Sequence, residues 1–86
     1  MDFNKIEIIK KIIADQLDIH ISDISENSDL FKELGADSFD IANIVSEIEV
    51  KFNISIPYVE TKYITKMNEL IEHTDNKLKK LEKYDI

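Results

Sequence analysis

Hydrophobic residues recur every three or four positions in three separate stretches of this chain, a spacing typical of amphipathic helices. The first stretch contains Phe3, Ile6, Ile9, Ile13 and Leu17. The second contains Ile41, Ile44, Val45, Ile48 and Phe52. The third contains Met67, Leu70, Ile71, Leu78 and Leu81, with Thr74 on the same stripe. We therefore predict helices over residues 3–17 and 38–52, and a last helix that Thr65 caps.

Glycine and proline each occur once, which leaves little turn chemistry for a β-rich fold. Pro57 closes the second helix, because the residue before a proline disfavours helix, and it suits the start of a short helix over residues 58–63. The predicted fold class is all-α. We expect a small four-helix bundle with three longer helices, a short third helix and a long loop between the first two.

The long loop covers residues 18–37 and is rich in Ser, Asn and Asp, which offer the backbone local hydrogen-bond partners. Gly35 can adopt the positive φ needed to swing the chain into the second helix. Six hydrophobic residues are expected to pin the loop onto the core: Ile19, Ile21, Ile24, Leu30, Phe31 and Leu34. Loops of this length are uncommon in small domains and are often functional.

The composition fits one small domain of 86 residues with enough hydrophobic content, 43%, for a modest core. Cysteine is absent, so the chain has no disulfide, no thiol of its own and no cysteine-based zinc site. No apolar run reaches transmembrane length, and residues 1–5 do not resemble a signal peptide. We expect a soluble, cytoplasmic monomer without stable membrane insertion.

Charge is distributed unevenly along the chain. Residues 15–49 contain ten acidic residues and one lysine, a net charge of −9, which would repel nucleic acid and attract partners with basic patches. Residues 77–83 contain four lysines and one glutamate, a net charge of +3. We divide the chain into a helical domain over residues 1–76 and a charged C-terminal extension over residues 77–86, which continues the last helix.

Ser38 begins the predicted second helix, three residues after the only glycine and between Asp37 and Asp40. The plainest role for this position is an N-cap, supplied by Asp37 or Ser38. A hydrolase serine is disfavoured, because its base must lie within hydrogen-bond reach, and His20 and His73 are both remote in sequence. Gly-x-Ser-x-Gly is absent, and no metal site is expected. The pattern favours a serine on which another enzyme acts.

The helical arithmetic places Phe39 and Val50 on a face that points away from the core, on the side of Ser38. An exposed phenylalanine on a small domain is a candidate anchor for a partner, although single exposed hydrophobic residues are also common without any function. We call this predicted docking surface the partner face. It comprises Phe39, Asp40, Ala42, Asn43, Ser46, Glu47, Glu49 and Val50.

The stretch Leu34-Gly35-Ala36-Asp37-Ser38-Phe39-Asp40 resembles the acyl carrier protein signature, in which Asp-Ser-Leu is usual. The resemblance covers about residues 3–75 and includes Ile54-Ser55-Ile56-Pro57 before the short helix. It implies a carrier without catalytic activity. A phosphopantetheinyl transferase would attach 4′-phosphopantetheine from coenzyme A to Ser38, next to its motif neighbour Asp37. The thiol of that cofactor would then carry acyl groups as thioesters.

The resemblance also implies partners and a cavity. The partners would be acyl-transferring and acyl-chain-modifying enzymes with basic docking patches, in fatty acid or related acyl-chain biosynthesis. In carriers of this kind the acyl chain folds back between the helices. The positions expected near that cavity are Val45, Ile48, Ile56, Ile64 and Ile71, which are equally suited to ordinary core packing.

Several positions depart from the family pattern. Phe39 replaces the usual Leu, and Lys32 stands where an acid is common. Ala42, Asn43 and Ser46 replace larger or more acidic residues, and Tyr58 and Val59 follow Pro57 where acids are frequent. Asp-Ser-Phe also occurs in D-alanyl carrier proteins. An aminoacyl carrier, a polyketide or secondary-metabolite carrier, and an unmodified helical adaptor therefore remain as alternatives.

Overall fold

The computed structural model describes residues 1–84, with side chains described for residues 1–81. Its elements are α1 (Phe3–Leu17), the 3₁₀ turn η1 (Ile21–Asp23), α2 (Ser38–Phe52), α3 (Tyr58–Thr61) and α4 (Met67–Tyr84). The all-α prediction is confirmed, since the described residues contain these helices and no strand. The last two positions of the predicted extension, residues 85–86, lie outside the described residues.

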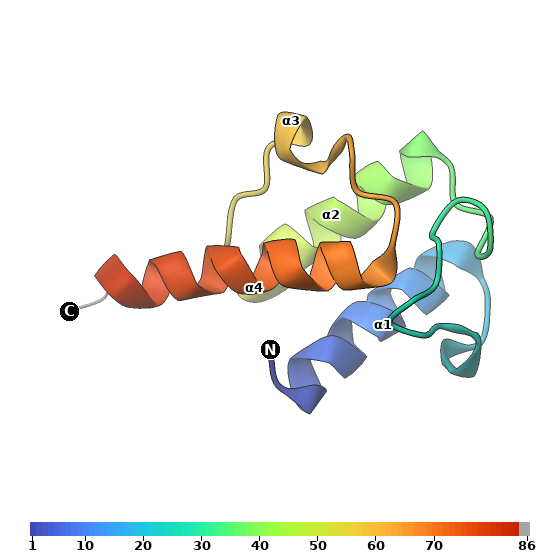
Figure 1. The fold of residues 1–86 in the computed structure, drawn as a ribbon, viewed down its shortest axis with the longest axis horizontal. Helices are drawn as coiled ribbons and strands as arrows, with labels where there is room; N and C mark the ends of the chain where they lie inside the picture. The colour runs from blue at the N-terminus through green and yellow to red at the C-terminus, as the bar shows by residue number, and fades with distance from the viewer. Residues whose placement is uncertain (85–86) are drawn as a thin grey trace.

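The core lies where α1, α2 and α4 face one another, with α3 at one edge and the long loop closing one end (Figure 1). Its fully buried side chains come from all three long helices and from the loop. They are Ile9, Ile13, Leu30, Ile44, Ile48, Met67, Leu70 and Thr74. The hydroxyl of Thr74, the one polar member, donates a hydrogen bond to the carbonyl of Leu70, so its burial leaves no polar atom without a partner.

Polar residues set the ends of α1 and α2. The Asp2 side chain accepts a hydrogen bond from the backbone N–H of Lys5 and so caps the start of α1. Asp18 ends α1 and Asn53 ends α2, each in the left-handed conformation, with φ of 54° and 55°. Asp and Asn tolerate this region better than other residues with side chains, which explains how two helices end cleanly without glycine.

Backbone hydrogen bonds join the long loop to the start of α4. The N–H of Leu30 donates to the carbonyl of Thr65 over 2.7 Å, and the N–H of Met67 donates to the carbonyl of Ser28 over 2.9 Å. The N–H of Asn68 donates to the carbonyl of Glu26 over 2.8 Å. The loop carbonyls thus satisfy amides that the first turn of α4 leaves without helical partners.

The segment between Asp29 and Ala36 turns back on itself before α2. The Asp29 carboxylate accepts hydrogen bonds from the N–H groups of Phe31 and Lys32. Gly35 has the predicted positive φ, 77°, and the N–H of buried Ala36 donates to the carbonyl of Leu30. This turn brings the chain to the start of α2 with Leu30 and Ala36 anchored in the core.

A carboxylate joins the short helix α3 to α4. One oxygen of Glu60 lies 2.8 Å from Nε2 of His73 and 2.7 Å from Nζ of Lys77. The hydrogen bond from Lys77, followed by that from His73, lowers the pKa of Glu60 below its usual value. Thr61 is the buried residue of α3. The short helix thus contacts α4 through charged side chains and buries one small side chain.

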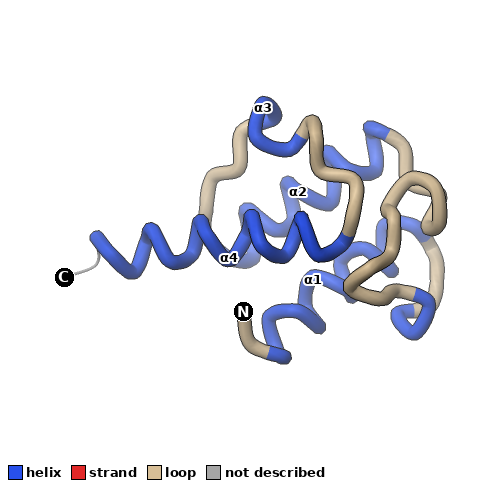
Figure 2. The backbone as a smooth tube through the Cα atoms, in the orientation of Figure 1, coloured by secondary structure: helices blue, strands red, loops and turns tan. Residues whose placement is uncertain are grey.

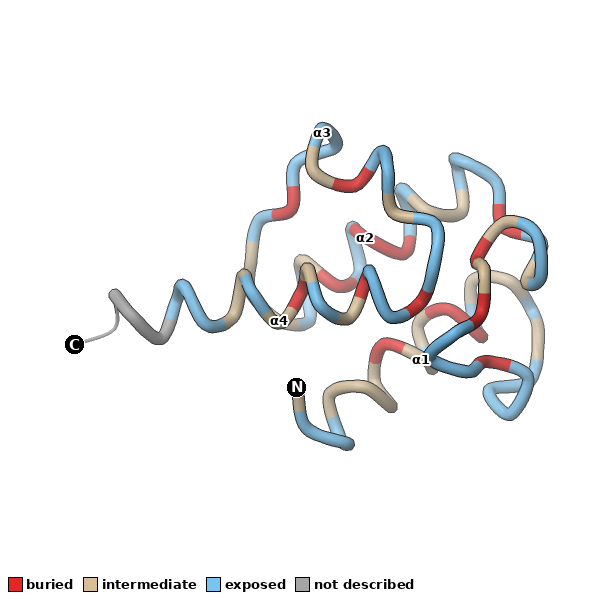
Figure 3. The backbone as a smooth tube through the Cα atoms, in the orientation of Figure 1, coloured by how far each residue is buried: buried red, intermediate tan, exposed pale blue. Residues whose placement is uncertain are grey.

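Three hydrophobic residues that we expected in the core lie at its margin. Phe3 is 73% exposed, Leu81 is 47% exposed and Ile21 is 40% exposed. Phe3 and Leu81 keep the helical period, but they belong to the first turn of α1 and the last turn of α4. In Figure 3 the buried stretches of both helices lie inward of these end turns. Ile21 belongs to η1, whose short turn faces solvent.

Thr65 does not cap α4 as predicted, because the helix begins at Met67. Instead Glu69 reaches back from the first turn, and its carboxylate accepts hydrogen bonds from the N–H groups of Thr65 and Lys66. The Thr65 hydroxyl donates to the same carboxylate over 3.2 Å. The first turn of α4 therefore carries its own acceptor, next to the loop carbonyls of Ser28 and Glu26.

Leu30→Ala should lower the free energy of unfolding by about 2–5 kcal/mol, because it opens a cavity at the fully buried residue that joins the loop to the core. Urea unfolding followed by circular dichroism measures this change. Ile21→Ala is the control in the same loop and should cost under about 1 kcal/mol. Equal losses for the two variants would show that the loop is not anchored through Leu30.

Candidate functional site

Ser38 is the first residue of α2 and is exposed, and Asp37 supplies the N-cap before it. The Asp37 carboxylate accepts the N–H of Asp40 over 2.8 Å, and the Asp40 carboxylate accepts the N–H of Asp37 over 3.0 Å. These reciprocal bonds form a capping box. Of the two predicted N-cap residues, Asp37 is therefore the one that caps α2. The Ser38 hydroxyl forms no hydrogen bond with the described residues and faces solvent.

Asp40 has a second structural partner on α1. Its other carboxylate oxygen accepts a hydrogen bond from Nε2 of Gln16 over 3.1 Å, so the start of α2 is tied to α1. The backbone N–H of Asp37, and then the Gln16 amide, lower the pKa of Asp40 below its usual value. Although we placed Asp40 on the partner face, its carboxylate is already engaged within the domain.

The surroundings of Ser38 offer no activating base. His73 pairs with Glu60 at the α3–α4 contact, and exposed His20 precedes η1. Neither histidine forms a hydrogen bond with Ser38 in the described part of the chain. In that part, no group of three or more His, Asp or Glu side chains could hold a metal ion. In the described residues Ser38 therefore has no histidine base within hydrogen-bond reach.

The expected partner face is largely accessible. Phe39 is 82% exposed and Val50 is 84% exposed, on opposite ends of α2. The exposed class also includes Ala42, Asn43, Ser46 and Glu47. Glu49 differs, because it is half-buried and its carboxylate accepts the N–H of Ile56 over 2.8 Å. Glu49 thus fixes the segment that leads into α3.

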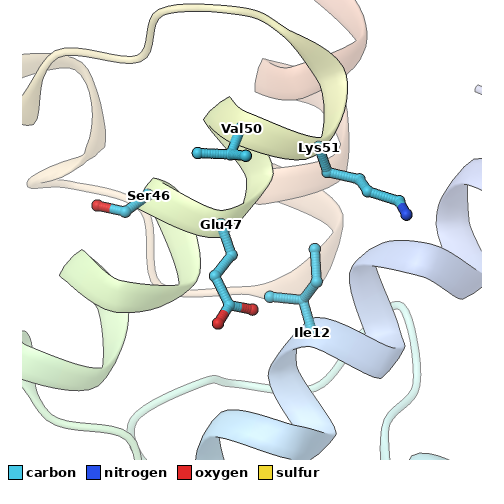
Figure 4. Close-up of a pocket in the computed structure, with 5 residues that line it drawn as sticks. All are labelled: Ile12, Ser46, Glu47, Val50 and Lys51. Atoms are coloured by element: carbon cyan, nitrogen blue, oxygen red, sulfur yellow. The ribbon is translucent and has the colours of Figure 1, made fainter.

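A groove lies between α1 and α2 on the surface next to Val50. It has a volume of about 380 Å³ and is lined by Ile12, Ser46, Glu47, Val50 and Lys51. Figure 4 shows Glu47 and Lys51 of α2 on either side of Ile12 of α1. The groove therefore has an apolar floor between side chains of opposite charge.

The residues expected near an acyl cavity divide into two groups. Val45, Ile48 and Ile56 are buried, whereas Ile64 and Ile71 are half-buried and pack against the core. A depression of about 200 Å³ lies between α2 and α3, and we call it the α2–α3 depression. Its lining residues are Ala42, Val45, Ser46, Glu49, Ile56, Tyr58 and Thr61. Only Val45 and Ile56 of the expected five line this depression.

A second, smaller depression of about 80 Å³ contains Ser38 itself, and we call it the Ser38 depression. Its lining residues are Phe31, Ser38, Ile41, Ala42, Tyr58, Thr61 and Lys62. Sequence reasoning did not assign Phe31, Ile41, Thr61 or Lys62 to a site. Helical periodicity reports neighbours along one helix, and nothing in it indicates that residues 58–62 lie beside Ser38.

Comparison with known proteins agrees with this geometry. The family model for the phosphopantetheine attachment site matches residues 7–73. An acyl carrier protein of Helicobacter pylori (strain J99) is 34% identical over 73 residues, which cover 84% of this chain and 94% of that protein. An acyl carrier protein of Wolinella succinogenes is 33% identical over 67 residues, which cover 78% and 88%.

The family match and the helical fold define the class as a phosphopantetheine-attachment domain. With the two relatives, they show that the chain belongs to the acyl carrier protein family. Its cofactor is therefore 4′-phosphopantetheine, which supplies the thiol that a sequence without cysteine lacks. The fold offers what such a group needs, an exposed hydroxyl at the start of α2. Within the described residues, no helix is long and apolar enough to cross a membrane.

Asp40→Asn should flatten the acid end of the stability profile. The folded pKa of Asp40 lies below its usual value, so the carboxylate contributes stability above that usual value and loses it as pH falls through the folded pKa. Melting temperatures measured from about pH 7 down to about pH 2 cover this window. The variant should melt lower than the wild type near neutrality and should lose less on acidification.

Glu47→Gln is the matched control, because Glu47 is an exposed acid on the same helix without a hydrogen bond to any described residue. Its acid profile should run parallel to that of the wild type. If Asp40→Asn and Glu47→Gln gave the same profile, the capping box would not be a source of the acid dependence.

Proposed function

We propose that Ser38 is the attachment residue and that the protein carries acyl intermediates for fatty acid or related acyl-chain biosynthesis. A phosphopantetheinyl transferase joins the Ser38 oxygen to the phosphate of the cofactor. When bound, the cofactor supplies a terminal thiol that holds an acyl group as a thioester. The protein itself has no catalytic activity and presents its cargo to partner enzymes in the cytoplasm as a monomer.

The observation that carries the proposal is the division of labour between Asp37 and Ser38. Because Asp37 caps α2, the Ser38 hydroxyl is exposed and does not have to break a structural hydrogen bond to react. The positive end of the helix dipole lies at the same place, where it favours a bound phosphate. The attachment oxygen is thus accessible on a rigid element.

Partner enzymes would dock on α2 through both charge and apolar contact. The acid-rich segment over residues 15–49 favours partners with basic patches. Phe39 and Val50 give the partner face two exposed hydrophobic contacts, with Ala42, Asn43, Ser46 and Glu47 between them. Asp40 and Glu49 would act chiefly as structural supports of this face, since their carboxylates already accept hydrogen bonds.

The acyl chain would lie between the helices, in an expanded form of the space around Val45, Ile48, Ile56, Ile64 and Ile71. The α2–α3 depression supports this placement because it opens above Val45 and Ile56. Side chains of the core would have to move apart to admit a chain, because Ile48 is fully buried. The cavity would therefore form as the cargo enters.

A specialised carrier, aminoacyl or secondary-metabolite, is the second candidate. Its support is the exposed Phe39 after the attachment serine, together with exposed Tyr58 and Val59 on α3. These side chains would change which enzymes dock without changing the attachment chemistry. Mass spectrometry of the group bound to the native protein distinguishes the two pathways.

Co-expression with a phosphopantetheinyl transferase should increase the intact mass by one phosphopantetheine. Ser38→Ala should abolish the gain, whereas Ser46→Ala, which removes another exposed serine of α2, should retain it. Mass spectrometry of the three proteins is the measurement. An unmodified wild-type chain with several transferases would refute the carrier proposal and favour a helical adaptor.

Phe39→Ala should weaken encounters with partner enzymes while the fold is preserved, because 82% of the side chain is exposed. We expect a loss of about tenfold in kcat/KM for a partner enzyme, the size of a moderate interface contact. Phe3→Ala is the control, since it removes another largely exposed phenylalanine, from α1. A loss of helical signal in Phe39→Ala would show that Phe39 supports the fold instead.

A further inference from the structure

The Ser38 depression is lined by a lysine as well as by Ser38. Lys62, which follows α3, is the only lysine among its lining residues, and Ser38 lies on the opposite, α2 side. Figure 2 shows α3 and the loop after it running alongside the N-terminal half of α2. The two residues line one depression although they stand 24 positions apart in the sequence. No motif in the chain indicates it.

The charges around Ser38 would favour a nearby cation. The capping box fixes the carboxylates of Asp37 and Asp40 within one turn of Ser38. A phosphodiester on Ser38 would add a third negative charge to the same turn, and like charges at short range repel. The helix dipole offsets part of that repulsion, and a nearby ammonium group offsets more.

Lys62 is available for this role in the described structure. Its Nζ lies 5.1 Å from the centre of the Tyr63 ring, and it forms no ion pair with the described residues. Tyr63 is an exposed side chain, so the cation–π contact is weak and easily exchanged for a stronger partner. The lysine stem is flexible, and the ammonium group can turn from the ring to the depression.

The two depressions adjoin along the edge between α2 and α3, and we call this line of surface the α2–α3 path. Ala42, Tyr58 and Thr61 line both depressions. The path therefore starts at Ser38 and Lys62, crosses these three residues, and reaches Val45 and Ile56. Its wall combines aromatic and aliphatic surface with few charges, which suits a chain of amides and methyl groups.

We propose that Lys62 is the counter-charge of the phosphodiester on Ser38 and directs the phosphopantetheine arm along this path, against Tyr58. The inference rests on the proposed attachment at Ser38. Lys62 acts as a positioning residue, because it orients the arm and takes no part in the transfer of acyl groups. The arm then points toward the α2–α3 depression before any cargo is loaded.

The test uses the holo protein, with loading at Ser38 checked first by intact mass. Nuclear Overhauser contacts between the geminal methyl groups of the arm and the Tyr58 ring report the path, and ³¹P relaxation reports the order of the phosphodiester. Lys62→Met should weaken these contacts by about twofold, the effect that an exposed ion pair supports, and Lys62→Arg should restore them. About 0.5 M sodium chloride should weaken the wild-type contacts in the same way.

Lys32→Met is the control, because it removes an exposed lysine next to Phe31 that does not line the depression. Its contacts and ³¹P relaxation should match the wild type. The inference is overturned if the loaded wild type lacks contacts to Tyr58, or if Lys62→Met leaves contacts and relaxation unchanged. Failure to load Ser38 at all is a separate result, and it would overturn the proposed function as well.

Discussion

Three backbone hydrogen bonds between the long loop and the start of α4 determine where Ser38 lies. They run from Leu30 to Thr65, from Met67 to Ser28 and from Asn68 to Glu26, and they hold a 20-residue connection, residues 18–37, against the last helix. Leu30 adds a fully buried side chain at the same point. The N–H of Ala36 donates to the carbonyl of Leu30. The anchored Leu30 therefore also holds Gly35 and the first turn of α2 in place. These contacts hold a long loop in one place where it leads into Ser38.

The first turn of α2 shows how structural and functional demands are separated on neighbouring residues. Asp37 and Asp40 satisfy each other's backbone amides, and Asp40 also holds Gln16 of α1. Both carboxylates therefore accept hydrogen bonds that stabilise the fold, whereas the Ser38 side chain forms no hydrogen bond with the described residues. The same arrangement places two carboxylates where a phosphodiester would be attached. A cation such as Lys62 would offset the repulsion between these carboxylates and the phosphodiester. Lys62 lines the Ser38 depression, at the start of the proposed path between α2 and α3.

The sequence predicts what local geometry determines. Helical spacing located α1 and α2, and Gly35 was identified as the turn before Ser38 because only a residue without a side chain adopts positive φ freely. Spacing does not tell where neighbouring helices stop, so it placed Phe3 and Leu81 in the core although both lie beyond it. Helical spacing also gives no information about contacts between segments that are distant in the sequence. Tyr58, Thr61 and Lys62 line the Ser38 depression because of the way α3 packs against α2. No local sequence pattern predicts that packing.

The short helix α3 is held in place by polar contacts more than by its own stability. It contains four residues, far below the length at which an isolated helix is stable. Glu49 binds the N–H of Ile56 on its N-terminal side, and Glu60 binds His73 and Lys77 of α4. These contacts lie near the surface, where water can replace them at small cost, whereas the long helices share fully buried side chains. The element that borders both depressions is therefore the one most easily displaced. In the proposed carrier, an acyl chain that entered beside Val45 would be accommodated by moving α3 while α1, α2 and α4 keep their packing.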